Sequence, residues 1–132
     1  WAEAEAAGHA FERAGGASRF AKLLLKSDNL GFSYSDVRFQ AGREADLWYK
    51  NHWEANIVLD GEVEITETAS GVTHTISTGG VYCVGPNDPH HLKVAVDSHI
   101  LSVFNPPVEG TERHDEDGGY PPTGPIPAGP SA

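Results

Sequence analysis

The first candidate for chemistry is Glu54, which begins a segment that alternates between apolar and polar residues. The side chains of a strand alternate between its two faces, so Glu54 shares a face with Asn56 and Val58. If that face points inward, a carboxylate enters an apolar interior, which is costly unless the carboxylate is paired or binds a metal. Glu54 is therefore a candidate metal ligand.

Tyr82 and one of two adjacent histidines, His90 or His91, could join Glu54 in a site with three ligands. Oxygen and nitrogen donors of this kind suit Fe(II), Mn(II) or Zn(II), and a free coordination position allows chemistry. Only one of the two histidines can point inward, because adjacent residues of a strand face opposite ways. Composition alone favours a plainer interpretation, in which Tyr82 is an ordinary strand aromatic, the histidines are turn residues and Glu54 faces solvent.

The segments that must position these residues are short, alternate in hydrophobicity and are separated by frequent turns, as is typical of a β-sandwich or barrel. Asp60-Gly61 predicts a tight hairpin between two of them. Another turn is expected at Asp97-Ser98. The predicted strands cover residues 19–26, 31–41, 46–50, 54–59, 62–66, 72–77, 81–84, 90–96 and 99–104.

Length and composition limit the classes of protein to which this chain can belong. At 132 residues it makes one domain with room for a real core. Its 19 acidic and 9 basic residues give a formal charge of −10, which argues against nucleic-acid or anionic-membrane binding. No apolar run approaches the roughly 18 residues of a membrane span. The single cysteine, Cys83, excludes an internal disulfide, so a cytoplasmic location is expected.

The chain divides into three segments. Residues 1–17 are rich in Ala and Glu and end on Gly-Gly, which predicts a short helical lead-in. Residues 18–120 hold all the predicted strands and are expected to form the barrel. Residues 121–132 form a tail rich in Pro and Gly, whose composition cannot build a core.

The stretch from Gly42 to Gly61 resembles the first sequence motif of the cupin superfamily, in which a Gly precedes a His-x-His pair, a Glu and a closing Gly. Glu54 and both glycines have the expected separations. Trp48 and Lys50 occupy the two histidine positions, so two of the usual metal ligands are absent.

The stretch from Gly79 to His91 resembles the second cupin motif, which ends in a ligand histidine after a turn with Pro or Gly. Counting from Gly79 selects His90 as that ligand, whereas counting from Gly80 selects His91. The spacing by itself leaves both choices open.

Several further runs resemble the ectoine synthase family, from about Leu23 to Pro121. The Tyr-Lys-Asn-His and His-Asp-Glu-Asp-Gly runs are specific, and chance does not produce both. The matching runs are Leu23-Leu24-Leu25-Lys26, Gly31-Phe32-Ser33, Ala41-Gly42, Tyr49-Lys50-Asn51-His52-x-Glu54-Ala55, Phe104-Asn105-Pro106-Pro107, Gly110, Glu112-Arg113-His114-Asp115-Glu116-Asp117-Gly118 and Tyr120-Pro121.

This resemblance implies an all-β fold, a small jelly-roll-like cupin barrel with a short N-terminal helical segment, assembled as a homodimer. It implies a hydro-lyase that uses Fe(II) to cyclise the small molecule N-γ-acetyl-2,4-diaminobutyrate to ectoine with loss of water. The implied iron ligands are Glu54, Tyr82 and His90, and the implied catalytic residues are Tyr49, Glu112 and His114. The residues expected to contact the substrate are Lys22, Ser35, Val37, Tyr49, Phe104 and His91.

Four positions depart from the family pattern and leave alternatives to this assignment. Ser18 replaces a Trp, Ser35 and Val37 replace an Asn and a Thr, and Asp46 replaces a common His.

Because these four positions help to hold the substrate, a paralogue that cyclises a related ω-amido amino acid is a second hypothesis. In such a paralogue, Lys22, Arg38 and Arg43 could hold a carboxylate that is placed differently on the substrate. A cupin that binds a small ligand without catalysis is a third.

Overall fold

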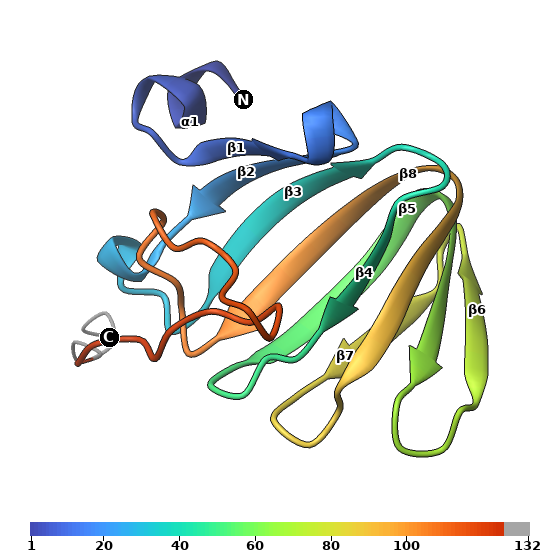
Figure 1. Ribbon diagram of the computed structural model, residues 1–132. Helices are drawn as coiled ribbons and strands as arrows, with labels where there is room; N and C mark the ends of the chain where they lie inside the picture. Colours follow the sequence, from blue (N-terminus) through green and yellow to red (C-terminus); the bar gives the residue numbers. More distant parts are fainter. Residues whose placement is uncertain (126–132) are drawn as a thin grey trace.

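The computed structural model of the protein describes residues 1–125 (Figure 1). The predicted all-β architecture and the short N-terminal helix are both present. The elements are α1 (Ala2–Ala6), β1 (Ala10–Arg13), η1 (Ala14–Gly16), β2 (Ser18–Leu24), η2 (Lys26–Asp28), β3 (Ser33–Phe39), β4 (Glu44–Leu47), β5 (Trp53–Glu67), β6 (Thr73–Ser77), β7 (Val81–Val84) and β8 (His90–Asn105).

The strands form one eight-stranded sheet in which every pairing is antiparallel, and the long strands β5 and β8 lie at its centre (Figure 1). The sheet runs in the order β1-β2-β3-β8-β5-β6, while β4 also pairs with β8 and β7 also pairs with β5. The main core lies on the inner face of this curved sheet. It contains Val37, Val58, Val63, Ile65, Ile76, Leu92, Val94 and Ile100.

The hairpin expected at Asp60-Gly61 does not form, and that prediction is wrong. β5 continues through both residues, and the register between β5 and β8 shifts repeatedly between Val58 and Val63. Gly61 has φ +104°, and a Cβ on it would lie 2.8 Å from Ser98 Cα and closer still to Ser98 Oγ. Gly61 therefore allows two long strands to approach closely, and the chain forms a β-bulge there instead of a hairpin turn.

The turn expected at Asp97-Ser98 is also wrong, because β8 runs unbroken through it. The Ser98 hydroxyl accepts a hydrogen bond from the Glu62 backbone N–H at 3.1 Å, which holds the two strands together at their bend. Two pairs of predicted strands thus merge into β5 and β8. β1, within the predicted lead-in, adds a strand that was not expected and pairs with β2.

Residues 106–125, which follow β8, have no regular secondary structure and fold back beside β2 and β3 (Figure 1). The Val108 N–H donates to Ser33 Oγ at 3.0 Å, and the Val108 carbonyl accepts from the Lys26 N–H at 2.8 Å. A second apolar cluster forms there from Tyr49, Val84, Phe104, Val108 and Tyr120. Residues 126–132 of the predicted tail lie outside the described part of the chain.

No helix in residues 1–125 is long and apolar enough to cross a membrane.

Gly61→Ala should destabilise the fold more than Gly71→Ala does, measured as the free energy of unfolding in urea. Both glycines have positive φ, but nothing lies within 4 Å of a Cβ on Gly71. Backbone strain should cost about 1 kcal/mol at either site, and overpacking against Ser98 should add about 1–3 kcal/mol at Gly61. Equal losses in the two variants would contradict the close crossing.

Candidate active site

A cavity of about 40 Å³ lies inside the curved sheet and gathers part of the predicted site. Of the predicted residues, Val37, Tyr49, Glu54, Tyr82 and His114 line it. Lys22, Ser35, Phe104, Glu112 and both candidate histidines are not among its lining residues. The rest of the lining is Arg13, Ser18, Phe20, Phe39, Arg43, Ala45, Leu47, Asn56, Leu92 and Ser102.

Glu54 faces this interior, as its alternation with Asn56 and Val58 predicts. The exposed fractions of the three residues are 7%, 2% and 0%, whereas the neighbouring Trp53 is 52% exposed. Burial raises the pKa of the Glu54 carboxyl to about 7, and the nearby Asn56 amide and Ser102 hydroxyl lower it only in part. Among residues 1–125, Glu54 makes no ion pair, so its negative charge lacks a compensating cation.

Tyr82 lies on the same side of the sheet as Glu54, one diagonal step away. Asn56 is directly opposite Tyr82 in the β5–β7 register, and Glu54 is opposite Val84. Diagonal neighbours of this kind lie within reach of long side chains. Burial, followed by the charge of Glu54, raises the pKa of the Tyr82 phenol well above its usual value. The phenol is therefore protonated unless a cation binds beside it.

His90 lies in the interior and His91 lies nearer the surface. His90 is 3% exposed and borders a second cavity, of about 600 Å³, that Tyr82 also lines. Its Nδ1 donates to the Asp88 carbonyl at 2.8 Å, which leaves the Nε2 lone pair as a potential metal donor. The His91 side chain is 37% exposed and contacts the carboxylate of Asp46 at 2.8 Å.

The donor chemistry of these residues fits a divalent metal. In residues 1–125, no group of three or more His, Cys, Asp or Glu side chains is arranged to hold a metal ion. The predicted set contains only two residues of those types, Glu54 and His90, with a phenol as the third donor. The uncompensated Glu54 carboxylate and the directed Nε2 of His90 are the two features that suit a bound cation.

Tyr49, His114 and Arg13 form a chain of hydrogen bonds at the edge of the cavity. The Tyr49 hydroxyl lies 2.9 Å from His114 Nε2, and an Arg13 Nη1 contacts His114 Nδ1. A guanidinium can only donate, so Nδ1 accepts and a neutral His114 carries its proton on Nε2. His114 then donates to the Tyr49 oxygen, which leaves the Tyr49 proton free to be donated into the cavity.

Burial sets the protonation states of this chain. It lowers the pKa of His114 to about 3, with the charges of Arg13 and Lys22 acting in the same direction. Burial also raises the pKa of Tyr49 well above its usual value, and the Glu54 charge adds to that effect. At neutral pH, His114 is thus a neutral imidazole and Tyr49 is a protonated phenol.

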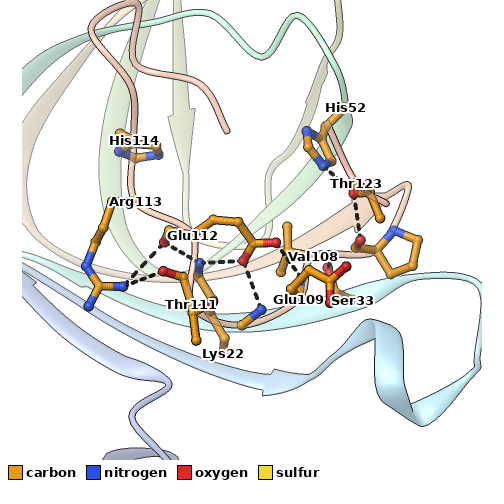
Figure 2. Close-up of polar contacts among 12 residues, drawn as sticks. Lys22, Ser33, His52, Val108, Glu109, Thr111, Glu112, Arg113, His114 and Thr123 are labelled. Carbon is orange, nitrogen blue, oxygen red and sulfur yellow. Dashed lines mark hydrogen bonds and ion pairs between the residues drawn. The ribbon is translucent and has the colours of Figure 1, made fainter. Parts of the chain in front are cut away.

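Lys22 and Glu112 form a buried ion pair outside the cavity (Figure 2). Their side chains are 2% and 8% exposed, and Lys22 Nζ also donates to the Glu112 carbonyl at 2.8 Å. Burial would raise the pKa of Glu112, but hydrogen bonds from the backbone N–H groups of Glu109 and Gly110, together with Lys22, keep that pKa below its usual value. Burial lowers the pKa of Lys22 to about 8.

Three polar residues of the cavity were not predicted from the sequence, namely Arg13, Asn56 and Ser102. The alternation that places Glu54 inward also places Asn56 inward, so this residue could have been identified. Arg43 was expected, with Lys22 and Arg38, as one of three basic residues that could hold a carboxylate of an alternative substrate. Arg13 could not be identified from the sequence, because residues 1–17 were expected to be helical. Arg13 reaches the cavity because β1, which carries it, pairs with β2.

His114→Gln should reduce the pH dependence of stability between pH 7 and 5.5. The folded protein binds a proton at His114 only near pH 3, whereas the unfolded chain does so near 6.5. The unfolded state therefore takes up that proton first as pH falls, and stability is lost below pH 6.5. The wild-type protein should lose about 1 kcal/mol more than the variant over this interval.

Urea unfolding at pH 7 and at pH 5.5 measures this difference between the two proteins. A destabilisation of the variant that is the same at both pH values does not affect the difference. His74→Gln is the matched control, since the His74 side chain is exposed and pairs with the surface residue Glu67. Identical pH dependence in the wild type and His114→Gln would show that His114 is not held neutral.

Comparisons with known proteins agree on one family. A family model described as ectoine synthase matches residues 3–124. L-Ectoine synthase of Saccharopolyspora erythraea is 42% identical over 103 residues, which cover 78% of this chain and 76% of that protein. The crystal structure of ectoine synthase from P. lautus superposes with a TM-score of 0.75 at 37% identity, over 91% of this chain and 85% of that chain.

A structure at lower identity shows the fold alone. An RmlC-like cupin from Shewanella frigidimarina superposes with a TM-score of 0.59 at 21% identity, over 72% of this chain and 81% of that chain. The expected small cupin barrel is thereby confirmed. The family match covers nearly all of the described residues, including every strand and the segment that carries His114. The chain belongs to the ectoine synthase family.

Proposed function

We propose that this protein is an ectoine synthase, which closes N-γ-acetyl-2,4-diaminobutyrate into the cyclic amidine ectoine. The observation that carries the proposal is the cavity shared by Tyr49, Glu54, Tyr82 and His114. It lies in a chain whose relatives are named L-ectoine synthase. The site offers a buried carboxylate, Glu54, and a phenolic proton donor, Tyr49, within one cavity.

The reaction is a net dehydration within one molecule. The α-amino nitrogen attacks the carbonyl carbon of the acetamide and forms a new C–N bond. The carbonyl oxygen then leaves as water, and two protons from the nitrogens accompany it. Holding both ends of one substrate in a closed cavity supplies rate through proximity, and excluding bulk water suppresses the reverse hydrolysis.

Tyr49 is the proposed proton donor to the departing oxygen. Its hydroxyl accepts from His114 Nε2, so its own proton is directed toward the cavity. His114 acts through Tyr49 as a positioning residue, because a histidine with a pKa of about 3 does not donate a second proton near neutrality. Glu112 acts on the reaction from outside the cavity, because its carboxylate pairs with Lys22 and accepts hydrogen bonds from two backbone N–H groups.

Fe(II) is the proposed cofactor, with Glu54, Tyr82 and His90 as the residues that would hold it. A bound divalent ion supplies Lewis-acid polarisation of the amide carbonyl, which is otherwise a poor electrophile. The uncompensated charge of Glu54 and the free Nε2 of His90 support this assignment.

The cavity must widen to admit this substrate. A volume of about 40 Å³ has room for a few water molecules. Tyr49, Tyr120 and His114 pack against one another there, with the ring centroids of His114 and Tyr120 4.7 Å apart. Because His114 and Tyr120 belong to the irregular segment after β8, they can move without breaking a strand pairing.

A second candidate substrate is a related ω-amido amino acid. The residues that line the cavity differ from the family pattern at Ser18 and Val37, and Lys22 is held in an ion pair away from the cavity. Changes of this kind at groups that hold a substrate alter specificity more readily than they alter the reaction type.

We extend the proposal to a cytoplasmic homodimer. The exposed free thiol of Cys83 supports a reducing compartment. Size-exclusion chromatography coupled to light scattering tests the homodimer directly.

The proposed function is tested by incubating the Fe(II)-loaded protein with N-γ-acetyl-2,4-diaminobutyrate and detecting, by mass spectrometry, a product lighter by one water. A panel of acetylated diamino acids of other chain lengths runs in parallel. Conversion of the first substrate supports the proposal, conversion of another panel member supports the second candidate, and no conversion of any contradicts both.

Tyr49→Phe should lower kcat by roughly 10²- to 10⁴-fold, the range for loss of a general acid. It should leave KM much less affected, because the ring packing against Phe104 and Tyr120 remains. The matched control is Tyr34→Phe on β3, which removes a hydroxyl from a tyrosine outside the cavity. Full activity of Tyr49→Phe would exclude Tyr49 as the proton donor.

The purified protein should bind about one Fe(II) per chain under reducing conditions, and His90→Ala should abolish this binding, because too few donors remain to hold a labile ion. Equilibrium dialysis followed by elemental analysis measures the occupancy. His91→Ala is the matched control, since it removes the adjacent, more exposed imidazole. Loss of iron in His91→Ala but not in His90→Ala would reverse the assignment of the ligand.

A further inference from the structure

Arg13 and Arg43 line the cavity without a carboxylate partner. Of the nine basic residues of the chain, six form ion pairs with Asp or Glu within residues 1–125, and the three that do not are Arg13, Arg43 and Arg113. Arg113 is exposed and stacks on the Phe11 ring. In a chain with 19 acidic residues, two unpaired guanidinium groups in one cavity indicate a site for an anion.

The two arginines are close enough to repel each other. Burial lowers the pKa of Arg43, and the positive charge of Arg13 lowers it further. Like charges in a partly buried site destabilise it unless an anion lies between them. Both arginines are held in place by the fold. Arg13 contacts His114 Nδ1, and Arg43 Nε donates to Ser18 Oγ at 2.9 Å.

A buried donor in the same cavity also lacks a partner. Asn56 is 2% exposed, and its Nδ2 lies near enough to Glu54 to lower the pKa of that carboxyl but makes no hydrogen bond of normal geometry within residues 1–125. Its Oδ1 already accepts from the Ser102 hydroxyl at 2.5 Å. An unsatisfied buried N–H is costly, and a ligand that carries hydrogen-bond acceptors would satisfy it.

The small side chain of Ser18 leaves room for Arg43 at the cavity. Its side chain is 1% exposed and small, and the family pattern has a Trp here. A Trp side chain would occupy space next to Ser18 Oγ that the Arg43 guanidinium now fills. Lys22, which stands where the family has a basic residue, is committed to Glu112 and does not line the cavity.

We propose that Arg13 and Arg43 bind the carboxylate of the substrate, in place of the basic side chain at position 22. This inference rests on the proposed function, which supplies a substrate with one carboxylate. The carboxylate then lies at the arginine end of the cavity and the reacting amide lies beside Tyr49 and Glu54. A guanidinium presents two parallel N–H groups that match a carboxylate, which favours this anion over a bulkier one in a narrow cavity.

Arg43→Gln tests the inference, since Arg43 does not contact His114 whereas Arg13 does. Isothermal titration calorimetry compares ectoine with the same cyclic amidine lacking its carboxylate. Arg43→Gln should weaken ectoine binding roughly 10- to 100-fold, the range for one charged hydrogen-bonded contact. It should leave binding of the neutral analogue unchanged. Arg43→Lys, which keeps the charge but not the paired N–H groups, should fall between wild type and Arg43→Gln.

Arg38→Gln is the matched control, because Arg38 is exposed, pairs with Asp36 and does not line the cavity. Thermal unfolding of each variant verifies that it is folded. Ectoine binding by Arg43→Gln at wild-type strength, or equal losses for ectoine and the neutral analogue, would overturn the inference. Inorganic phosphate that competes with ectoine as strongly as acetate does would also overturn the inference, because the site would then bind anions in general.

A measurement of acetate binding tests this inference independently of the proposed reaction, because binding requires no turnover. Acetate binding that is present in the wild type and in Arg38→Gln but lost in Arg43→Gln supports the carboxylate site, even if the protein does not convert N-γ-acetyl-2,4-diaminobutyrate. Turnover of that substrate together with Arg43-independent acetate binding would leave the proposed function standing and contradict the inference.

Discussion

The close approach of β5 and β8 at Gly61 and Ser98 is the constraint on which the rest of the structure depends. Each strand bends there without ending, so its two halves pair with different neighbours. One half of β5 carries Glu54 and Asn56, and it pairs with the half of β8 that carries Ser102. A side chain at position 61 would push the strands apart and uncouple these halves.

The charges inside the barrel are of two kinds. Lys22 and Glu112 neutralise each other, and backbone N–H groups complete the environment of the carboxylate, so this pair needs nothing from outside. Glu54 and the arginines at positions 13 and 43 carry buried or partly buried charge without such partners. Within residues 1–125, these charges without partners gather around the cavity.

The Lys22–Glu112 pair also connects the fold to the site. It fastens the irregular chain after β8 to β2, which brings His114 and Tyr120 onto the Tyr49 ring. This segment has no regular secondary structure, so apart from the backbone hydrogen bond between Lys26 and Val108 it relies mainly on side-chain contacts to hold its position. The protonation of Tyr49 and His114 thus depends on an ion pair with which neither residue forms a hydrogen bond, and Figure 2 shows His114 apart from that pair.

Much of the fold follows from local sequence patterns. Alternation along 54–58 determines that Glu54 and Asn56 point inward together, because a strand turns each successive side chain to the opposite face. Short alternating segments separated by turn residues determine an all-β chain, and the runs around Tyr49 and His114 are sufficient to identify the family. These features depend only on neighbours in the sequence.

Tertiary structure decided where strands continue and which residues meet. Asp60-Gly61 has the composition of a hairpin turn, yet the close approach of Gly61 to Ser98, far along the chain, makes it a bulge. Arg13 lines the cavity only because β1 pairs with β2, and Lys22 lies outside the cavity because it forms an ion pair with Glu112. Such outcomes depend on contacts between distant segments, whose geometry and charge balance no local pattern encodes.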